Sequence, residues 1–241
     1  MKIAIVGTGR MGNEISKLID EDSTLEKVEL LSDLFSNEDL KFSEIPDCIL
    51  DASHPDNLSK IIKFATEYNT KCVIATTNFT EEQIKDIQQL ATKVPVLRST
   101  NFSIGVAVLN KLAEIATPLL KEDFDIEIIE KHHNKKIDSP SGTAKTLFNT
   151  INKEEEFNPV YSREGVCKRD NNDVGILSLR GGSLFGEHSV FYCGENEVIE
   201  VKHTAYSRSI FASGMLKSAK WLEDKPNGLY SINDLLFKEE N

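Results

Sequence analysis

The chain has no long hydrophobic run, no close pair of cysteines and no excess of basic residues, and each absence excludes a class of protein. Its apolar runs fall far short of the roughly 20 residues that cross a bilayer, and Ile3 to Val6 leads at once into glycines without a signal-peptide cleavage pattern. The four cysteines are widely dispersed, with no Cys-x-x-Cys pair and no histidine at zinc-ligand spacing. We therefore expect reduced thiols, no bound metal and a cytoplasmic protein.

Acidic residues outnumber basic ones, 39 against 28, which gives a formal net charge of −11. Nucleic acids and anionic membranes are bound through dense basic patches, so we expect neither as a partner. With 241 residues, 39% of them hydrophobic, the chain is long enough for one large domain or two small ones with a packed core. An anionic ligand would need a local concentration of cations.

The first hundred residues alternate short apolar strands with amphipathic helices. Strands are expected at 2–6, 28–31, 48–50, 72–74 and 95–97, and helices after residue 12, over 58–65 and over 84–90. Thr80 and Gln83 fit a capping box at the start of the last of these helices. Continuous apolar strands in such an alternation predict a parallel sheet covered on both faces, an α/β fold of the Rossmann type.

The pattern changes after residue 97. We expect a helix over 104–120, a strand with period-two alternation over 124–128, and strands at 174–179, 189–193 and 198–203. The last two are joined by a turn at 194–196, whereas 152–172 lacks periodicity and is expected to be a long loop. These elements predict a second domain of α+β type with a mixed sheet. A closing helix over 209–222 is expected, but sequence alone does not assign it to a domain.

A glycine-rich turn follows the first strand. Gly7, Gly9 and Gly12 have the spacing of a dinucleotide fingerprint, for the tight turn, the approach of a pyrophosphate and helix packing. Asp33 follows about 20 residues later, where an acid accepts hydrogen bonds from the adenosine ribose. We interpret this turn as an NADH or NADPH site, with Asp33 favouring NADH. Arg10 remains open between a solvated cation, an adenine contact and a partner for a 2′-phosphate.

Small polar loops follow the later strands, at 52–55, 75–77 and 99–102. Ligands of such folds bind beyond the carboxyl ends of the strands, although the same residue types occur in loops that bind nothing. The expected cofactor-binding residues are Gly7, Thr8, Gly9, Arg10, Met11, Gly12, Asp33, Ala75, Thr76, Thr77, Ser99, Thr100, Asn101 and Phe102.

The densest chemical stretch runs from Glu130 to Thr143, between a strand and a helix expected to start near Ser141. Two histidines and three lysines precede the free amides of a helix N-terminus, an arrangement that attracts anions. Histidine can donate a proton near neutrality, and lysine can hold a carboxylate or act as an acid. Side chains of His132 and His133 would point oppositely on a strand, which makes them poor joint metal ligands. A basic surface loop is the alternative, but in so acidic a chain the cluster favours a functional site.

This stretch resembles the signature of a known family. Glu130, His132-His133, Lys136, Asp138 and Pro140 to Thr143 match the pattern of 4-hydroxy-tetrahydrodipicolinate reductases, also called dihydrodipicolinate reductases. Further similarities, in the right order, are Gly-Arg-Met-Gly at 9–12, Ala-Thr-Thr at 75–77, Asn-Phe-Ser-Ile-Gly-Val at 101–106, Arg-Gly-Gly at 180–182 and Gly-Glu-His at 186–188. Many members have one more residue in the glycine turn, and several have alanine at the position of Lys131.

The resemblance implies an NAD(P)H-dependent oxidoreductase of lysine and diaminopimelate biosynthesis, which reduces 4-hydroxy-tetrahydrodipicolinate, a cyclic dicarboxylate, to tetrahydrodipicolinate with loss of water. It implies that His132 donates a proton and that Lys136 is a second acid and substrate contact. His133 would contact the substrate, and Gly142 with Thr143 would hold one of its carboxylates.

The same resemblance implies an architecture. An NAD(P)-binding domain over 1–103 would be completed by 212–241, and 104–211 would bind the substrate and build a homotetramer around its sheet.

Two other functions are weighed against this one. A nicotinamide-dependent dehydrogenase for another small acidic metabolite, such as an amino acid, would be blocked less by pyridine-2,6-dicarboxylate. A module that senses nucleotides without chemistry would bind NADH normally, and substitution of His132 or Lys136 would change nothing measurable.

Overall fold

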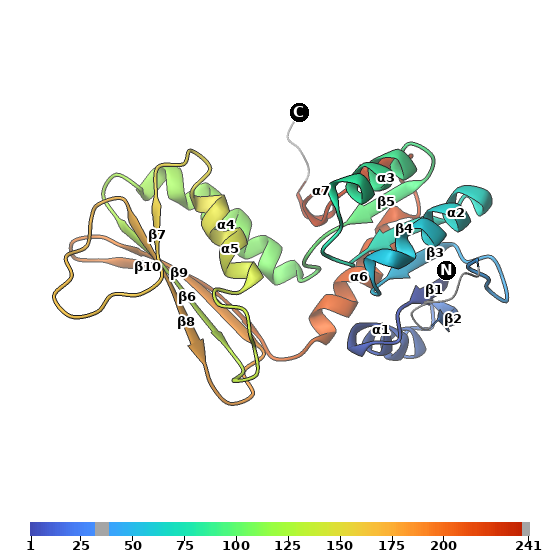
Figure 1. Cartoon of the computed structure of the whole chain (residues 1–241), viewed down its shortest axis with the longest axis horizontal. Helices are drawn as coiled ribbons and strands as arrows, with labels where there is room; N and C mark the ends of the chain where they lie inside the picture. The colour runs from blue at the N-terminus through green and yellow to red at the C-terminus, as the bar shows by residue number, and fades with distance from the viewer. Residues whose placement is uncertain (32–38, 238–241) are drawn as a thin grey trace. The chain divides into compact units, whose positions relative to one another are not determined.

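The computed structural model describes residues 1–31 and 39–237. They form two compact units, one of residues 1–104 with the segment from 208 onward and the other of residues 105–207 (Figure 1). Each unit has its own sheet. Asp33 lies outside the described residues. Of the helices in those two ranges, none is long and apolar enough to cross a membrane.

A six-stranded sheet of order β11-β5-β4-β3-β1-β2 forms the first unit, and all of its neighbouring strands run parallel. The strands are β1 (Lys2–Val6), β2 (Glu26–Leu31), β3 (Cys48–Asp51), β4 (Lys71–Ile74), β5 (Pro95–Arg98) and β11 (Gly228–Tyr230). The predicted parallel α/β fold is confirmed. Strand β11 was not predicted, because three residues are too few to show a period; it is extended because it pairs with β5.

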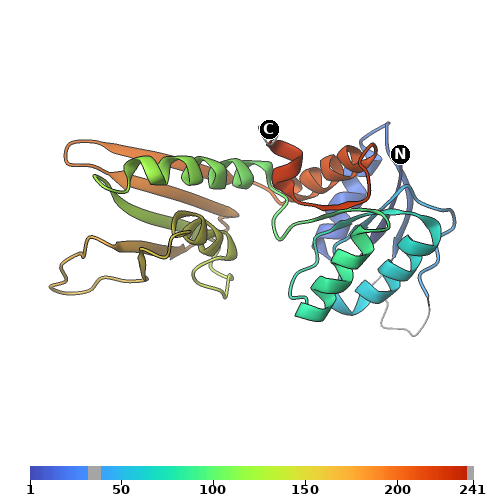
Figure 2. The ribbon, with the colours of Figure 1, turned by 90° about the horizontal axis from the view of Figure 1, so that it is seen from above.

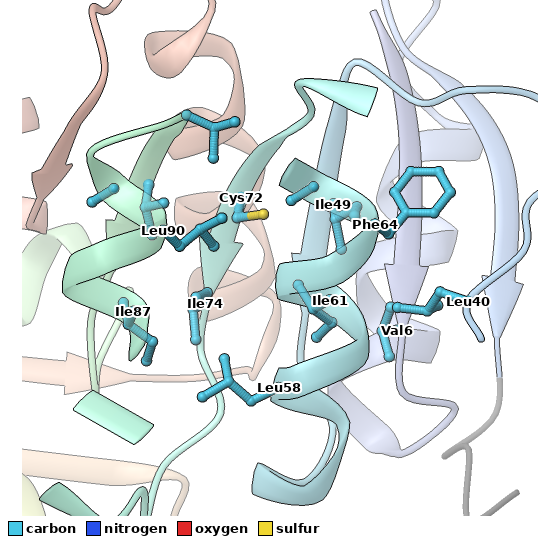
Figure 3. Packing of buried hydrophobic residues seen from close by; sticks show 14 residues of the cluster. Val6, Leu40, Ile49, Leu58, Ile61, Phe64, Cys72, Ile74, Ile87 and Leu90 are labelled. Carbon is cyan, nitrogen blue, oxygen red and sulfur yellow. The ribbon is translucent and has the colours of Figure 1, made fainter. Parts of the chain in front are cut away.

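Helices pack on this sheet through their apolar sides. They are α1 (Arg10–Asp20), the short η1 (Pro55–Asn57), α2 (Leu58–Tyr68), α3 (Glu81–Ala91), α6 (Ser209–Leu222) and α7 (Ile232–Leu236). Figure 3 shows side chains of α2 and α3, among them Ile61 and Ile87, facing those of β3 and β4 in one buried cluster. The predicted capping box of α3 is present, with Thr80 and Gln83 bonding each other's backbone amides.

Helix α6 belongs to the first unit although it follows the second unit in sequence. Gly214 allows it to approach closely, because a Cβ atom there would lie 1.8 Å from the carbonyl oxygen of Phe102. Near the other end of α6, the ammonium of Lys220 lies 2.7 Å from the carboxylate of Asp22. The closing part of the chain therefore completes the sheet unit with which the chain begins.

The second unit is a five-stranded sheet of order β10-β9-β6-β8-β7. Its strands are β6 (Asp125–His132), β7 (Asn158–Val160), β8 (Asp173–Arg180), β9 (Gly186–Cys193) and β10 (Val198–Ala205), and its helices are α4 (Ile104–Leu120) and α5 (Gly142–Ile151). Strand β6 pairs parallel with β8 and antiparallel with β9, so the predicted mixed sheet is confirmed. Both helices pack on one face of the sheet, and in Figure 2 the green α4 runs beside its strands.

The prediction of an unbroken loop over 152–172 was wrong at one point. Residues 158–160 form β7, which adds to the edge of the sheet by pairing in parallel with β8. Pro159 lies within it, and an edge strand accepts proline because one of its sides needs no donor. A three-residue strand of this kind is held by its pairing and has no period of its own.

Candidate active site

The glycine turn of the first unit has the geometry of a nucleotide-binding turn. Gly7 has a φ of 112°, and a Cβ atom there would lie 2.4 Å from the carbonyl oxygen of Ala52. At Gly12 a Cβ atom would lie 1.8 Å from the carbonyl oxygen of Gly7, so α1 rests directly on the turn. At Gly9, by contrast, a Cβ atom would meet nothing within 4 Å, and α1 begins there without a side-chain cap. The open space and the free amides fit a pyrophosphate.

A cavity of about 380 Å³ lies beyond the carboxyl ends of β3, β4 and β5. Seven predicted cofactor residues line it, namely Met11, Ala75, Thr76, Thr77, Thr100, Asn101 and Phe102. Phe211 and Met215 of α6 also line it and were not predicted, since they lie more than a hundred residues further along the chain than Phe102. The lining combines small, polar and apolar side chains, which suits a flat heteroaromatic ring.

Other predicted cofactor residues have different positions. Ser99 turns into its own loop, where its hydroxyl donates to the carbonyl oxygen of Asn101 at 2.7 Å and accepts from the amide of that residue at 3.1 Å. Thr8 and Arg10 are exposed in the glycine turn. Thr76 is buried, and its hydroxyl accepts a hydrogen bond from the Ser53 amide at 2.9 Å. Ser99 and Thr76 thus also shape the loops on which the site is built.

Strand β6 supplies the centre of the second candidate site. Its burial alternates, and Ile126, Ile128, Glu130 and His132 share the face that α4 and α5 cover. The first two are ordinary core residues, whereas the last two place a carboxylate and an imidazole at the end of the same face. Charged groups are seldom fully buried unless they are paired, so this position requires partners.

Glu130 has no exposed surface and accepts five hydrogen bonds. Its Oε2 atom lies 2.6 Å from His132 Nδ1 and 2.7 Å from Arg180 Nη1. Its Oε1 atom accepts from Arg180 Nη2 at 2.6 Å, from the Ser178 hydroxyl at 2.8 Å and from the Ser141 amide at 3.0 Å. Burial by itself would raise the pKa of Glu130, but the hydrogen bonds from His132, Arg180 and Ser178 outweigh it and hold the pKa well below its usual range. Glu130 is therefore a carboxylate.

His188 of β9 packs against this group. Its ring meets that of His132 edge to face, with centroids 5.1 Å apart, and its Nε2 atom lies 2.9 Å from the hydroxyl of Ser141. Burial, together with the neighbouring His132, lowers the pKa of His188 to about 3. His188 is therefore neutral at physiological pH and does not compete for a proton.

The start of helix α5 faces the same group. Ser141 caps the helix, with its hydroxyl accepting from the Ala144 amide at 3.2 Å. A Cβ atom at Gly142 would meet nothing within 4 Å, so the first amides of the helix border open space. Thr143 is half-buried in the first turn. This arrangement can hold an anionic oxygen.

The predicted cations have unequal surroundings. The Lys136 ammonium lies 2.8 Å from Asp138 Oδ1, and this contact lowers the pKa of the Asp138 carboxyl. Arg180 also donates to the carbonyl oxygen of Asp138 at 2.7 Å, which ties the loop to the strand. His133 is half-buried, whereas Lys135 is exposed. Within residues 1–31 and 39–237 no group of three His, Cys, Asp or Glu side chains is placed to hold a metal.

Sequence reasoning assigned no role to three residues of this group, Glu130, Arg180 and His188. All three fall within the motifs compared above, but their mutual contact depends on the pairing of β6 with β8 and β9. One signal was available. Glu130 continues the buried alternation of residues 126 and 128. A carboxylate at such a core position indicates a group that is paired with a cation or hydrogen-bond donors.

Comparison with known proteins shows which family this chain matches. The model "Dihydrodipicolinate reductase, N-terminus" matches residues 1–102, and "Dihydrodipicolinate reductase, C-terminus" matches residues 105–236. A 4-hydroxy-tetrahydrodipicolinate reductase of Exiguobacterium sibiricum is 40% identical over 250 positions, covering 100% of this chain and 98% of the relative. One of Brachyspira hyodysenteriae is 42% identical over 238 residues, covering 98% of this chain and 100% of the relative.

Solved structures agree in fold. A dipicolinate-bound dihydrodipicolinate reductase from a Paenisporosarcina species is 25% identical with a TM-score of 0.79, over 98% of this chain and 99% of that chain. Diaminopimelate dehydrogenase of C. glutamicum, solved with its ligand, has a TM-score of 0.53 at 14% identity, over 96% of this chain and 92% of that chain. The second likeness is one of fold alone.

Proposed function

The chain belongs to the dihydrodipicolinate reductase family, and we propose on this premise that its two units divide the work of one reductase. It reduces 4-hydroxy-tetrahydrodipicolinate to tetrahydrodipicolinate with a pyridine nucleotide, in lysine and diaminopimelate biosynthesis. In our proposal residues 1–103 with 212–241 bind the nucleotide, and residues 104–211 bind the substrate. The match of two family models to almost the whole chain carries this conclusion.

The first unit has the features that a nicotinamide dinucleotide requires. When bound, the reduced nicotinamide supplies a hydride. The open space over Gly9 would take the pyrophosphate, and the cavity that Ala75, Thr77 and Phe102 line would take the ring. Between the two nucleotides, we propose that Asp33 favours NADH, because a carboxylate accepts hydrogen bonds from ribose hydroxyls and repels a 2′-phosphate.

The reaction consumes one hydride and one proton and releases one water. We propose that His132 gives the proton, since its ring is the titratable group at the end of the buried face of β6. Lys136 would contact the substrate and serve as a second acid. Asp138, whose carboxylate lies 2.8 Å from its ammonium, would keep it oriented until the substrate arrives.

The start of α5 would bind one carboxylate of the substrate. The space over Gly142 is open, the first amides of the helix border it, and Thr143 adds a hydroxyl. His133 would contact the substrate from the loop that follows β6. In a chain of net charge −11, these local donors are what an anionic substrate needs.

We further propose a cytoplasmic homotetramer. All four cysteines are free, as expected for a reducing compartment. Helices α4 and α5 bury only one face of the second sheet; on the other face Ile129 and Phe191 are half-buried and Leu179 is exposed. A mass measured by light scattering tests the assembly, and a monomer or dimer at working concentration would contradict it.

The test of function is spectrophotometric. Freshly generated 4-hydroxy-tetrahydrodipicolinate should cause loss of the nicotinamide absorbance with the native chain, and far less with His132→Gln or Lys136→Ala. Pyridine-2,6-dicarboxylate should compete with the substrate. Absence of oxidation above background would disprove the reductase. Turnover of an amino acid with weak inhibition by the dicarboxylate would indicate a different dehydrogenase.

A further inference from the structure

The hydrogen bonds of Glu130 determine which ring nitrogen of His132 carries the proton. An ionised carboxylate has no proton and can only accept hydrogen bonds, so every polar partner of it must be a donor. Two guanidinium nitrogens, a hydroxyl and a backbone amide already donate to Glu130. The fifth partner, His132 Nδ1 at 2.6 Å, must therefore donate as well. In the neutral imidazole the proton lies on Nδ1, and Nε2 carries the lone pair.

The surroundings of Nε2 fit this tautomer. Among the residues that the structure describes, Nε2 of His132 has no hydrogen-bond partner, and the side chain keeps 11% of its surface exposed. A Cβ atom added at Gly186 would approach this nitrogen to 3.1 Å, but the glycine has none. Only Nε2 is thus available to gain and lose a proton without breaking the contact with Glu130.

Glu130 also reaches the start of helix α5. Its Oε1 atom accepts from the amide of Ser141, the residue that caps that helix. One rigid buried group consequently contacts both the imidazole and the helix N-terminus. The bidentate contact of Arg180 holds the carboxylate in a single orientation, since a guanidinium and a carboxylate match in two parallel hydrogen bonds.

We propose that Glu130 is a positioning residue, which acts through His132 to keep the proton on Nδ1 so that the proton given to the substrate leaves from Nε2. Arg180 is the clamp that orients Glu130 for this task. The inference rests on the proposed role of His132 as acid only for its effect on turnover. The tautomer itself follows from the contacts of Glu130.

The decisive variant is Glu130→Gln. The glutamine keeps the shape of the side chain, and Arg180 and Ser178 still need an acceptor, so its oxygen turns to them. Its amide group then faces Nδ1 and donates to it, which moves the neutral imidazole proton to Nε2. With the wrong tautomer the ring cannot accept and release a proton at Nε2, and we expect kcat to fall by about 100-fold while KM changes little.

The tautomer of His132 distinguishes a positioning role of Glu130 from a purely structural one, because loss of stability alone would not change the tautomer. Nitrogen-15 NMR of histidine-labelled protein distinguishes protonated from bare ring nitrogens, and comparison with His132→Gln assigns the signal. At a pH at which the ring is neutral, the native protein should have Nδ1 protonated, and Glu130→Gln should have Nε2 protonated. Glu130→Asp, which restores an anion, should return the native signature in part.

Glu127→Gln is a matched control. Glu127 lies on the same strand, is held by two guanidinium nitrogens of Arg163 at 3.0 and 2.9 Å, and belongs to the opposite set of alternate residues. It loses an equivalent ion pair, so its thermal stability should fall similarly. Its kcat and the signature of His132 should stay native.

The outcomes are separable. A native protein whose neutral His132 carries its proton on Nε2 would overturn the proposal, and this needs no variant to fold. An unchanged tautomer in folded Glu130→Gln would overturn it too, whatever happens to kcat. If His132→Gln instead retained full turnover, the acid role under the proposed function would fail, while the tautomer measurement would still decide the positioning by Glu130.

Discussion

Gly186 backs directly onto the imidazole of His132: a Cβ atom added at Gly186 would lie 3.1 Å from Nε2 and 3.4 Å from Cδ2. Such distances are shorter than ordinary contacts, so a side chain there would displace the ring by a few tenths of an ångström. Glu130 holds the other side of the ring at Nδ1. The imidazole is therefore located between a fixed carboxylate and a position at which any side chain would press on the ring.

Substitution Gly186→Ala should accordingly impair proton donation more than folding. We expect kcat to fall roughly tenfold, since small displacements of a reacting group are costly, with little change in nucleotide affinity. Steady-state kinetics and nucleotide titration measure the two effects. Gly181→Ala is the control, because a Cβ atom there would meet only Leu179 at an ordinary 3.5 Å. Equal kinetics for both variants would show that the ring has room to adjust.

His188 should make the stability of the protein depend on pH. Its folded pKa of about 3 lies below the usual 6.5, because it is buried and faces His132. The unfolded chain therefore binds a proton between these values that the folded chain does not, and the free energy of unfolding falls as the pH falls through this window. From about pH 7 to about pH 5 the contribution is about 2 kcal/mol.

Denaturant unfolding of the native protein and of His188→Gln at both pH values measures this contribution. The glutamine can still form a hydrogen bond with the Ser141 hydroxyl, which His188 contacts at 2.9 Å, so the site is preserved while the titrating group is removed. The variant should lose about 2 kcal/mol less on acidification. The same loss in both proteins would mean that His188 already binds its proton in the folded state.

Local patterns in the sequence were enough for much of the fold. Thr80 and Gln83 specify the capping box of α3 by contacts three residues apart, and Gly7 and Gly12 specify the turn that sets α1 on the sheet. The short strands β7 and β11 could not be predicted in this way. Each has three residues and is extended only because a neighbouring strand pairs with it.

The sequence suggested candidate site residues where they are adjacent in the chain, and it did not suggest those that only the fold brings together. His132 and Lys136 stand in one recognisable stretch, whereas Arg180 reaches Glu130 from a strand some 50 residues away. Phe211 and Met215 line the proposed nucleotide cavity from a helix that follows the second unit in sequence. Tertiary contacts of this kind leave no periodic trace in the sequence.

Lys136→Ala should harm turnover more than nucleotide affinity. Lys136 lies in the second unit, whereas every residue that lines the proposed nucleotide cavity belongs to the first. The substitution removes a proposed acid and substrate contact and leaves Asp138 without its partner at 2.8 Å. Exposed Lys135 in the same loop gives the control Lys135→Ala, which should stay near native. Loss of NADH affinity in step with kcat, by direct titration, would contradict this division.

Asp33→Asn should shift nucleotide preference toward NADPH. An aspartate after the second strand favours the ribose hydroxyls of NADH, and its charge repels the 2′-phosphate of NADPH. Neutralising it should weaken NADH binding and strengthen NADPH binding, and titration of both nucleotides gives the ratio. Arg10→Ala separates the alternative roles of that residue, since only a partner of the 2′-phosphate would affect NADPH alone. An unchanged ratio of NADH to NADPH affinity in Asp33→Asn would show that another residue determines the nucleotide preference.

Gly9→Ala and Gly142→Ala form a reciprocal pair. At each position a Cβ atom would meet nothing within 4 Å, so neither variant should disturb packing or lower the unfolding temperature appreciably. The added methyl would fill the space over an open helix start, that of α1 in the first variant and that of α5 in the second.

We expect Gly9→Ala to weaken nucleotide binding about tenfold or more, because the backbone can no longer approach the pyrophosphate closely. Inhibition by pyridine-2,6-dicarboxylate should be unchanged in this variant. Gly142→Ala should do the opposite, weakening the dicarboxylate and sparing the nucleotide. If either methyl affected both ligands equally, the assignment of the two open helix starts to two different anions would be wrong.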